Sequence, residues 1–132
     1  MRAVLVPGTL ALLPAYASME DPVAELRAAC LTAVGWLGRD VTVLADAQGT
    51  RIAEYLLDHS DRAHDEPSYL VVGNGSACRS EKAPGHLDER AHRFDAELGA
   101  ALASSGPEWP SLDLGERLLG CLDGIRRLRM VL

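Results

Sequence analysis

Residues 69–95 read Y-L-V-V-G-N-G-S-A-C-R-S-E-K-A-P-G-H-L-D-E-R-A-H-R-F-D. This stretch combines an unbroken apolar run, a glycine turn, a dense polar loop and the beginning of a helix. A continuous apolar run is typical of a strand that is buried on both faces, as the strands of parallel sheets are. The stretch therefore decides the fold class, and it also contains most of the candidate functional residues.

The rest of the chain alternates apolar runs with segments of helical periodicity. The predicted strands occupy residues 3–6, 41–45 and 69–72, and the predicted helices residues 21–37, 51–57, 87–104 and 112–128. Asp21, Thr50 and Asp88 are the expected N-caps, and residues 127–132 suit a last strand as an alternative. This alternation predicts an α/β fold with a small, mostly parallel sheet flanked by helices. The length predicts a single domain over residues 1–132.

The loops that follow the predicted strands carry residues suited to a binding site. Right-handed crossovers between parallel strands bring the strand C-termini to one edge of the sheet. Pro7-Gly8, Asp46 and the loop after Gly73 are therefore expected at that edge, where open α/β sheets bind their ligands. A sheet of three or four strands also leaves its edge strands unpaired, which predicts a homo-oligomer.

Composition and charge exclude several functional classes. The net charge of -6 and the pI of about 5.1 argue against nucleic acid as a partner and against docking on anionic membranes. The three cysteines are odd in number and widely separated, which indicates a reducing, cytoplasmic setting. The apolar N-terminus resembles a signal peptide in outline, but its prolines and glycine favour a buried strand followed by a loop.

The loop over residues 73–86 is the candidate small-molecule site. Its polar members have complementary chemistry: Arg79 and Lys82 are suited to a carboxylate or phosphate, and Glu81 or His86 to general acid–base catalysis. The amides around Gly75 and Ser76 suit a ligand oxygen, although such a turn also serves structure alone. Ion pairing within the loop is an equally acceptable interpretation of its charged residues.

His59 lies near several aspartates and could bind a metal together with Asp58, Asp61 or Asp65. A single histidine in a charged loop is more often solvated than bound to a metal. We therefore expect neither a metal nor another cofactor.

Residues 73–91, followed by Phe94-Asp95, resemble the class III extradiol ring-cleavage dioxygenase superfamily of the protocatechuate 4,5-dioxygenase β-subunit type. The similarity is greatest to an actinobacterial branch with the pattern G-D-G-S-A-R-R-T-E-K-A-P-G-Y-L-D-x-R-A. Residues 4–7 also resemble the opening strand of that branch. The resemblance implies an abridged version of a three-layer α/β fold.

The resemblance also implies that the usual chemistry is lost. Active relatives bind non-haem Fe(II) with two histidines and a glutamate, and a further histidine acts in acid–base catalysis. Gly8 stands where the first metal histidine is expected, and Ala77 where the acid–base histidine is expected. We expect a divergent protein that binds an aromatic or carboxylate ligand or performs metal-independent acid–base chemistry. The alternative is a non-catalytic structural or interaction protein that assembles as an oligomer.

Overall fold

The computed structural model describes residues 1–74, 81–82 and 87–103. The chain divides into two compact units, Met1–Gly73 with Asp123–Leu132, and Asn74–Leu122, and each is described by itself. Whether both units fold together as one domain, as the length suggests, stays a prediction. The predicted helix over residues 112–128 and the alternative strand over residues 127–132 lie outside the described residues.

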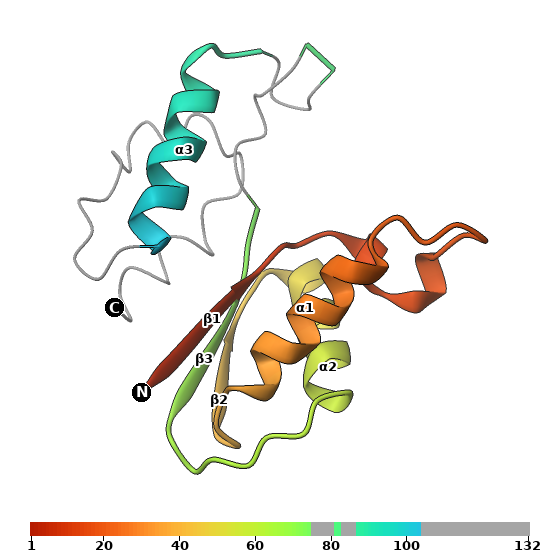
Figure 1. Cartoon of the computed structure of the whole chain (residues 1–132), viewed down its shortest axis with the longest axis vertical. Coiled ribbons are helices and arrows are strands. Elements are labelled where there is room, and N and C mark those ends of the chain that lie inside the picture. Colours follow the sequence, from red (N-terminus) through yellow and green to blue (C-terminus); the bar gives the residue numbers. More distant parts are fainter. Residues whose placement is uncertain (75–80, 83–86, 104–132) are drawn as a thin grey trace. The chain divides into compact units, whose positions relative to one another are not determined.

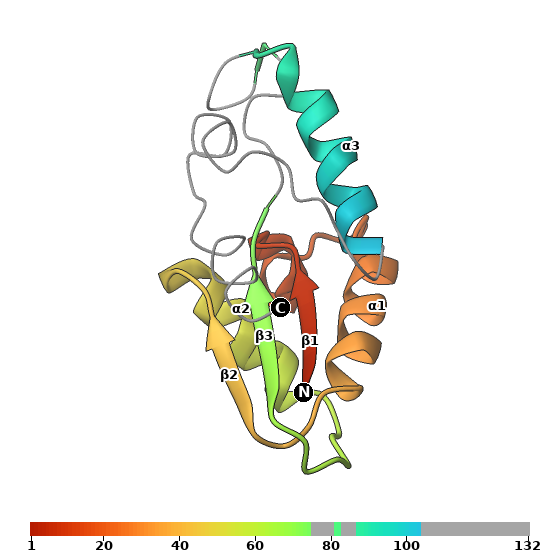
Figure 2. The same cartoon turned by 90° about the vertical axis from the view of Figure 1, so that its left-hand side faces the viewer.

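The first unit is built on a three-stranded parallel sheet (Figure 1). Its strands are β1 (Arg2–Val6), β2 (Val41–Leu44) and β3 (Ser68–Val72), in the spatial order β1-β3-β2. Strand β3 is therefore central, and it pairs with both neighbours. Figure 2 shows the three strands side by side. The predicted α/β class with a small parallel sheet is confirmed.

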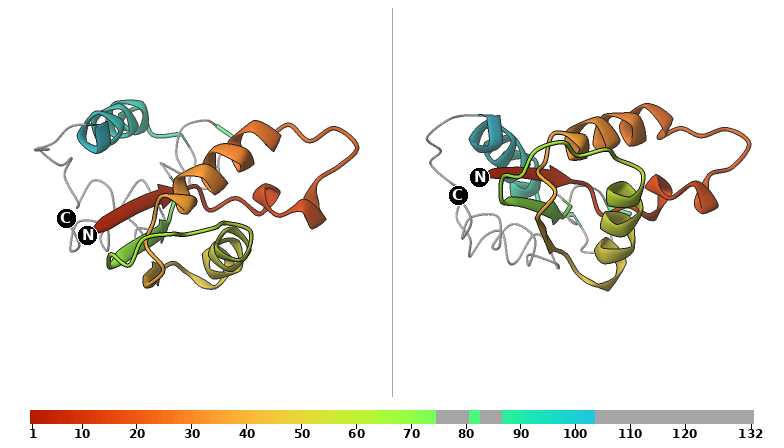
Figure 3. Two further views of the ribbon diagram at one scale, coloured as in Figure 1. Left: turned by 60° about the horizontal axis from the view of Figure 1, so that its bottom comes forward. Right: turned by 90° about the horizontal axis from the view of Figure 1, so that it is seen from below.

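Both helices of this unit lie on one face of the sheet. The helices are α1 (Ala24–Gly35) and α2 (Ala47–Asp58), preceded by the short 3-10 turns η1 (Leu10–Leu12) and η2 (Pro14–Tyr16). Figures 1 and 3 show α1 and α2 on the same side of the strands. The connection from β1 to β2 and the return from β2 to β3 cross the sheet in opposite directions. With both helices on one face, the two crossovers have opposite hands. This differs from the expectation that all crossovers are right-handed.

One hydrophobic cluster explains why the two helices share a face. Alternate side chains of the strands point into it, and the inner faces of both helices pack on them. The fully or almost fully buried members of this cluster are Val6, Leu12, Cys30, Val34, Leu37, Ile52, Ala53, Leu56, Leu70 and Val72. Helical spacing predicts a buried stripe of Val23, Leu26, Cys30, Ala33 and Leu37 on α1. This prediction is partly wrong, because Val34 rather than Ala33 is buried in the cluster and Leu26 is 42% exposed.

The start of α1 also differs from the prediction. The helix begins at Ala24 rather than directly after Asp21, and its N-cap Val23 makes no side-chain cap. Asp21 instead forms an ion pair with Arg27, and this hydrogen bond lowers the pKa of the Asp21 carboxyl. Arg27 also donates to the carbonyl oxygens of Leu12 and Ala11, at 2.6 and 2.8 Å. Arg27 thus joins α1 to η1, and Asp21 pairs with the Arg27 guanidinium instead of capping the helix.

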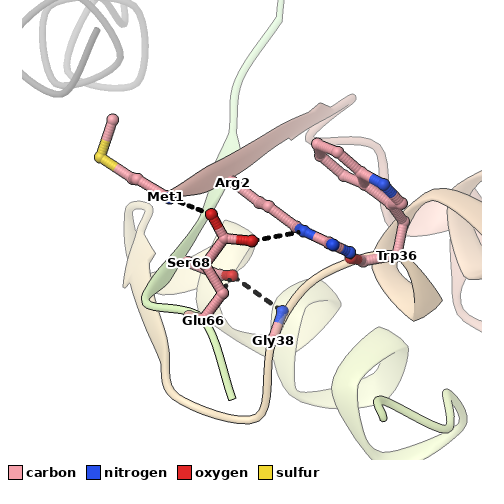
Figure 4. A network of polar contacts seen from close by, with 6 residues as sticks. All are labelled: Met1, Arg2, Trp36, Gly38, Glu66 and Ser68. Atoms are coloured by element: carbon pink, nitrogen blue, oxygen red, sulfur yellow. Dashed lines mark hydrogen bonds and ion pairs between the residues drawn. The ribbon is translucent and has the colours of Figure 1, made fainter. Parts of the chain in front are cut away.

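Polar contacts fix the beginning of β3 between its neighbours (Figure 4). The buried Ser68 hydroxyl accepts a hydrogen bond from the Gly38 amide, at 2.8 Å, and donates one to the Glu66 carbonyl, at 3.0 Å. The Glu66 carboxylate pairs with Arg2 and with the N-terminal amine, which lowers the Glu66 pKa. Arg2 in turn lies over the Trp36 ring, 4.7 Å from its centroid.

The second unit contributes one described helix, α3 (Arg90–Ala103). Asp88 accepts a hydrogen bond from the Arg90 amide, at 2.9 Å, and pairs with the Arg90 side chain. These contacts lower the pKa of Asp88 to about 2. Helical spacing predicts an apolar face of Leu87, Ala91, Phe94, Leu98 and Leu102. Ala91, Phe94 and Leu98 are buried, but Leu87 precedes the helix and is 48% exposed.

Replacing Gly38 by alanine is expected to destabilise the chain. A Cβ at Gly38 would lie 1.9 Å from the Glu66 carbonyl oxygen, so the backbones must separate. Overpacking of this kind lowers the free energy of unfolding by about 1–3 kcal/mol. Urea unfolding measures the change, and a Gly38→Ala chain as stable as the parent would contradict the close approach.

Gly99→Ala is the matched control for this experiment. Gly99 lies on the exposed side of α3, and nothing lies within 4 Å of a Cβ placed there. Alanine in an exposed helix interior is expected to raise the free energy of unfolding by about 0.5–1 kcal/mol.

Candidate functional site

The three strand C-termini meet at one edge of the sheet, as predicted. Val6 pairs with Val72, and Leu44 pairs with Val71, so the residues after each strand leave from the same edge. The Gly73 amide continues the ladder by donating to the Val6 carbonyl, at 3.0 Å. Gly8 and Gly73 therefore lie at the carboxyl edge of the sheet, where parallel sheets bind ligands.

Helix α2 begins at this same edge. Asp46 is its N-cap, because one carboxylate oxygen accepts a hydrogen bond from the Gly49 amide at 2.6 Å. The Thr50 amide donates to the Asp46 carbonyl at 2.8 Å. The position of Asp46 at this edge is as predicted, but the predicted N-cap is Thr50. The helix therefore starts four residues earlier than predicted.

Two further contacts hold the start of α2 against the strand ends. The Gln48 side-chain amide donates to the Gly8 carbonyl at 2.8 Å, which connects the loop after β1 to the helix. Gly49 is buried, and a Cβ there would lie 3.0 Å from the Ala45 side chain and 3.1 Å from that of Val72. The small residue therefore allows the helix to approach the end of β3. Gln48 and Gly49 are not among the predicted site residues. The aspartate that follows the predicted apolar strand is the signal for this helix start.

The predicted loop site is only partly described. Glu81 and Lys82 form a turn in the second unit and are exposed. The other predicted site residues, Gly75, Ser76, Arg79 and His86, lie outside the described residues, as does Ala77. The predicted convergence of these side chains stays a prediction.

The described residues contain no cluster of side chains that could hold a metal ion. Gly8 provides no side-chain ligand after β1. Over residues 1–74, 81–82 and 87–103, no three His, Cys, Asp or Glu side chains gather as metal ligands. The suggestion that His59 binds a metal with neighbouring aspartates therefore finds no support in this part of the chain.

His59 has a structural environment at the other end of α2. It is the C-cap, its Nδ1 lies 2.8 Å from the Tyr55 carbonyl oxygen, and its ring stacks on Tyr55 at 4.3 Å between centroids. A helix of this length separates its two ends by about 18 Å. His59 is therefore remote from the edge at which Asp46 and Gly8 lie.

Cys30 is the cysteine that the structure describes, and it is buried in the hydrophobic cluster. Burial raises the pKa of the Cys30 thiol. Because the thiolate is the reactive form, Cys30 is a packing residue rather than a nucleophile.

Comparison of the chain with protein-family models, with curated proteins and with solved structures finds no match. No helix in the described part of the chain is both long and apolar enough to cross a membrane.

The cap at the start of α2 can be tested by replacing Asp46. Asp46→Ala removes the acceptor for the Gly49 amide, and loss of an N-cap lowers the free energy of unfolding by about 1 kcal/mol. Asp46→Asn keeps a side-chain oxygen and is expected to stay close to the parent. Urea unfolding distinguishes the two variants, and equal stabilities of all three chains would contradict the capping role.

Proposed function

We propose that this chain is a divergent extradiol-dioxygenase-like protein of the cytoplasm that binds an aromatic or carboxylate ligand without Fe(II). The observation that carries the proposal is the meeting of Gly8, the start of α2 and Gly73 at one edge of the sheet. Ligands of open parallel sheets bind at such an edge.

The loop over residues 73–86 supplies the polar chemistry in this proposal. It leaves the sheet at the proposed site, because Gly73 directly follows β3 and is bonded to Val6. Arg79 and Lys82 would pair with the carboxylate of the ligand. Glu81 or His86 would move a proton if the ligand is turned over, since both residue types act as general acids and bases.

In this proposal, glycines at the strand ends would allow a ligand to approach the backbone. A histidine after β1 would place an imidazole at the edge, whereas Gly8 leaves no side chain there. Glycine is suited to close approach between a backbone and a ligand. In this proposal, glycine in place of the metal-binding histidine at position 8 favours direct contact between the bound small molecule and the backbone of the loop after β1.

Ligand binding is expected to raise the melting temperature. Benzoate and 3,4-dihydroxybenzoate are suitable probes, with phenol as the analogue that lacks a carboxylate. Saturation at 100 times Kd stabilises the folded chain by about 2.7 kcal/mol. Arg79→Ala should abolish the shift caused by the carboxylates, because it removes their proposed partner.

Arg93→Ala is the matched control for charge, because Arg93 is exposed on α3 and pairs with Glu97 at 2.7 Å. It should retain the full shift. If no probe changes the melting temperature, and Arg79→Ala and Glu81→Ala alter stability alone, the ligand proposal is wrong.

Iron binding provides a separate test of the proposed loss of ring cleavage. The purified chain is incubated anaerobically with Fe(II), desalted and analysed for metal. We expect no stoichiometric iron, since Gly8 and Ala77 replace the expected histidines. One iron per chain, lost on His59→Ala, would overturn this part of the proposal.

The second candidate function is a non-catalytic interaction protein that assembles as a homo-oligomer. It is favoured by two exposed apolar side chains at the two ends of α1, Leu26 at 42% and Trp36 at 53%. In addition, β1 and β2 are the edge strands among the strands that the structure describes.

Light scattering at micromolar concentration tests the assembly. An oligomer that Leu26→Glu converts into a monomer would favour the second candidate. Thr32→Glu is its control, because Thr32 is an exposed polar residue of the same helix. A monomeric parent chain would exclude this candidate.

A further inference from the structure

Arg51 differs from the other arginines that the structure describes. Within the described part of the chain, its guanidinium has one hydrogen-bond partner, the Tyr16 hydroxyl, at 3.2 Å. Each of the other described arginines donates to a carboxylate or to a backbone carbonyl oxygen, and these are Arg2, Arg27, Arg39, Arg62, Arg90 and Arg93. A guanidinium carries several N–H donors in a planar fork, so most of the hydrogen-bonding capacity of Arg51 is left for water or a ligand.

Tyr16 places an aromatic ring and a hydroxyl beside this cation. It belongs to η2 and is 51% exposed. The guanidinium carbon of Arg51 lies 5.8 Å from the centroid of the Tyr16 ring. The pair therefore presents a cation, a phenol hydroxyl and an aromatic ring together at the surface. These are groups that bind a carboxylate and stack on the ring that carries it.

The pair lies close to the carboxyl edge of the sheet. Arg51 is in the helix that Asp46 caps, roughly 7.5 Å along its axis from the cap. Gln48 is three residues before Arg51, so the two side chains share one side of α2. Gln48 contacts the Gly8 carbonyl, and Arg51 contacts Tyr16 further along the same loop. One side of α2 thus holds the loop after β1 at two points beside the strand ends.

We infer that Arg51 and Tyr16 form a binding site for the carboxylate of an aromatic acid. Arg51 would donate charge-assisted hydrogen bonds to the carboxylate, and the ring of Tyr16 would pack on the ring of the ligand. The inference rests on the proposed function for the class of ligand, but it takes its residues from the first unit alone. A carboxylate has several acceptor positions, so hydrogen bonds from Arg51 are compatible with the proposed role of Arg79.

Binding of benzoate and benzamide tests this site, because benzamide has nearly the same shape and no negative charge. Dissociation constants are measured for the full chain by NMR titration. Arg51→Ala should weaken benzoate binding by about tenfold or more, since hydrogen bonds to charged groups are the stronger ones, and should leave benzamide binding nearly unchanged. Arg51→Lys keeps the charge without the planar fork and should bind benzoate with intermediate affinity.

Tyr16 is tested in the same titrations. Tyr16→Ala removes the ring and should weaken the binding of benzoate and of benzamide alike. Tyr16→Phe keeps the ring and should retain most of the affinity for both ligands.

Arg39→Ala is the matched control for charge. The Arg39 side chain is 64% exposed and pairs with Asp65 at 3.0 Å, next to Gly38 and away from the carboxyl edge. This variant should bind both ligands as the parent does. Urea unfolding shows whether each variant is folded, and Arg51→Gln replaces Arg51→Ala if the alanine variant is not.

The outcomes separate this inference from the proposed function. If the parent binds benzoate and Arg51→Ala binds it equally well, the pair only joins the loop to α2, and the inference alone is wrong. An equal loss of benzoate and benzamide binding in Arg51→Ala would show a structural effect and would also overturn it. A parent chain that binds neither ligand at millimolar concentration would contradict both the inference and the proposed function.

Discussion

The structure depends on the register of β3 between β1 and β2. At the beginning of β3, the buried Ser68 hydroxyl joins the backbone before β2 to the backbone before β3, through Gly38 and Glu66. The same Glu66 holds Arg2 at the start of β1. Because a shift of one residue would turn every strand side chain to the wrong face, these contacts also determine which side chains enter the core. They lie at the edge of the sheet opposite the candidate site.

The consequence of this register is seen at the carboxyl edge. With all three strands in parallel, Gly8, Asp46 and Gly73 leave the sheet together, and the start of α2 joins them. The contacts of Ser68 and Glu66 thus lie at the amino edge, and the residues of the proposed ligand site lie at the carboxyl edge. The proposed ligand site lies at the carboxyl edge for this reason, and Gly8 contributes backbone but no side chain to it.

The sequence predicts the strands well and the helix starts poorly. Runs of valine and leucine identify all three strands to within a residue, although the exposed Thr42 interrupts the run of β2. Helix starts depend on which side chain accepts which amide. Asp21 forms an ion pair with Arg27 instead of capping, and Asp46 takes the role assigned to Thr50. Helical spacing also predicts that Leu26 is buried, but its side chain is exposed. Spacing alone does not show where a short helix crosses a narrow sheet.

The candidate site is predictable in its place but not in its contacts. Parallel strands dictate the edge, whereas Gln48 reaching the Gly8 carbonyl depends on the packing of α2 against β3, which Gly49 permits. Amide chemical-shift mapping with 3,4-dihydroxybenzoate tests the central claim most directly. The account predicts saturable shifts of the Gly8, Gly49 and Gly73 amides, with Gly38 and His59 unchanged. Shifts confined to Gly38 and His59, or none at millimolar ligand, would contradict it.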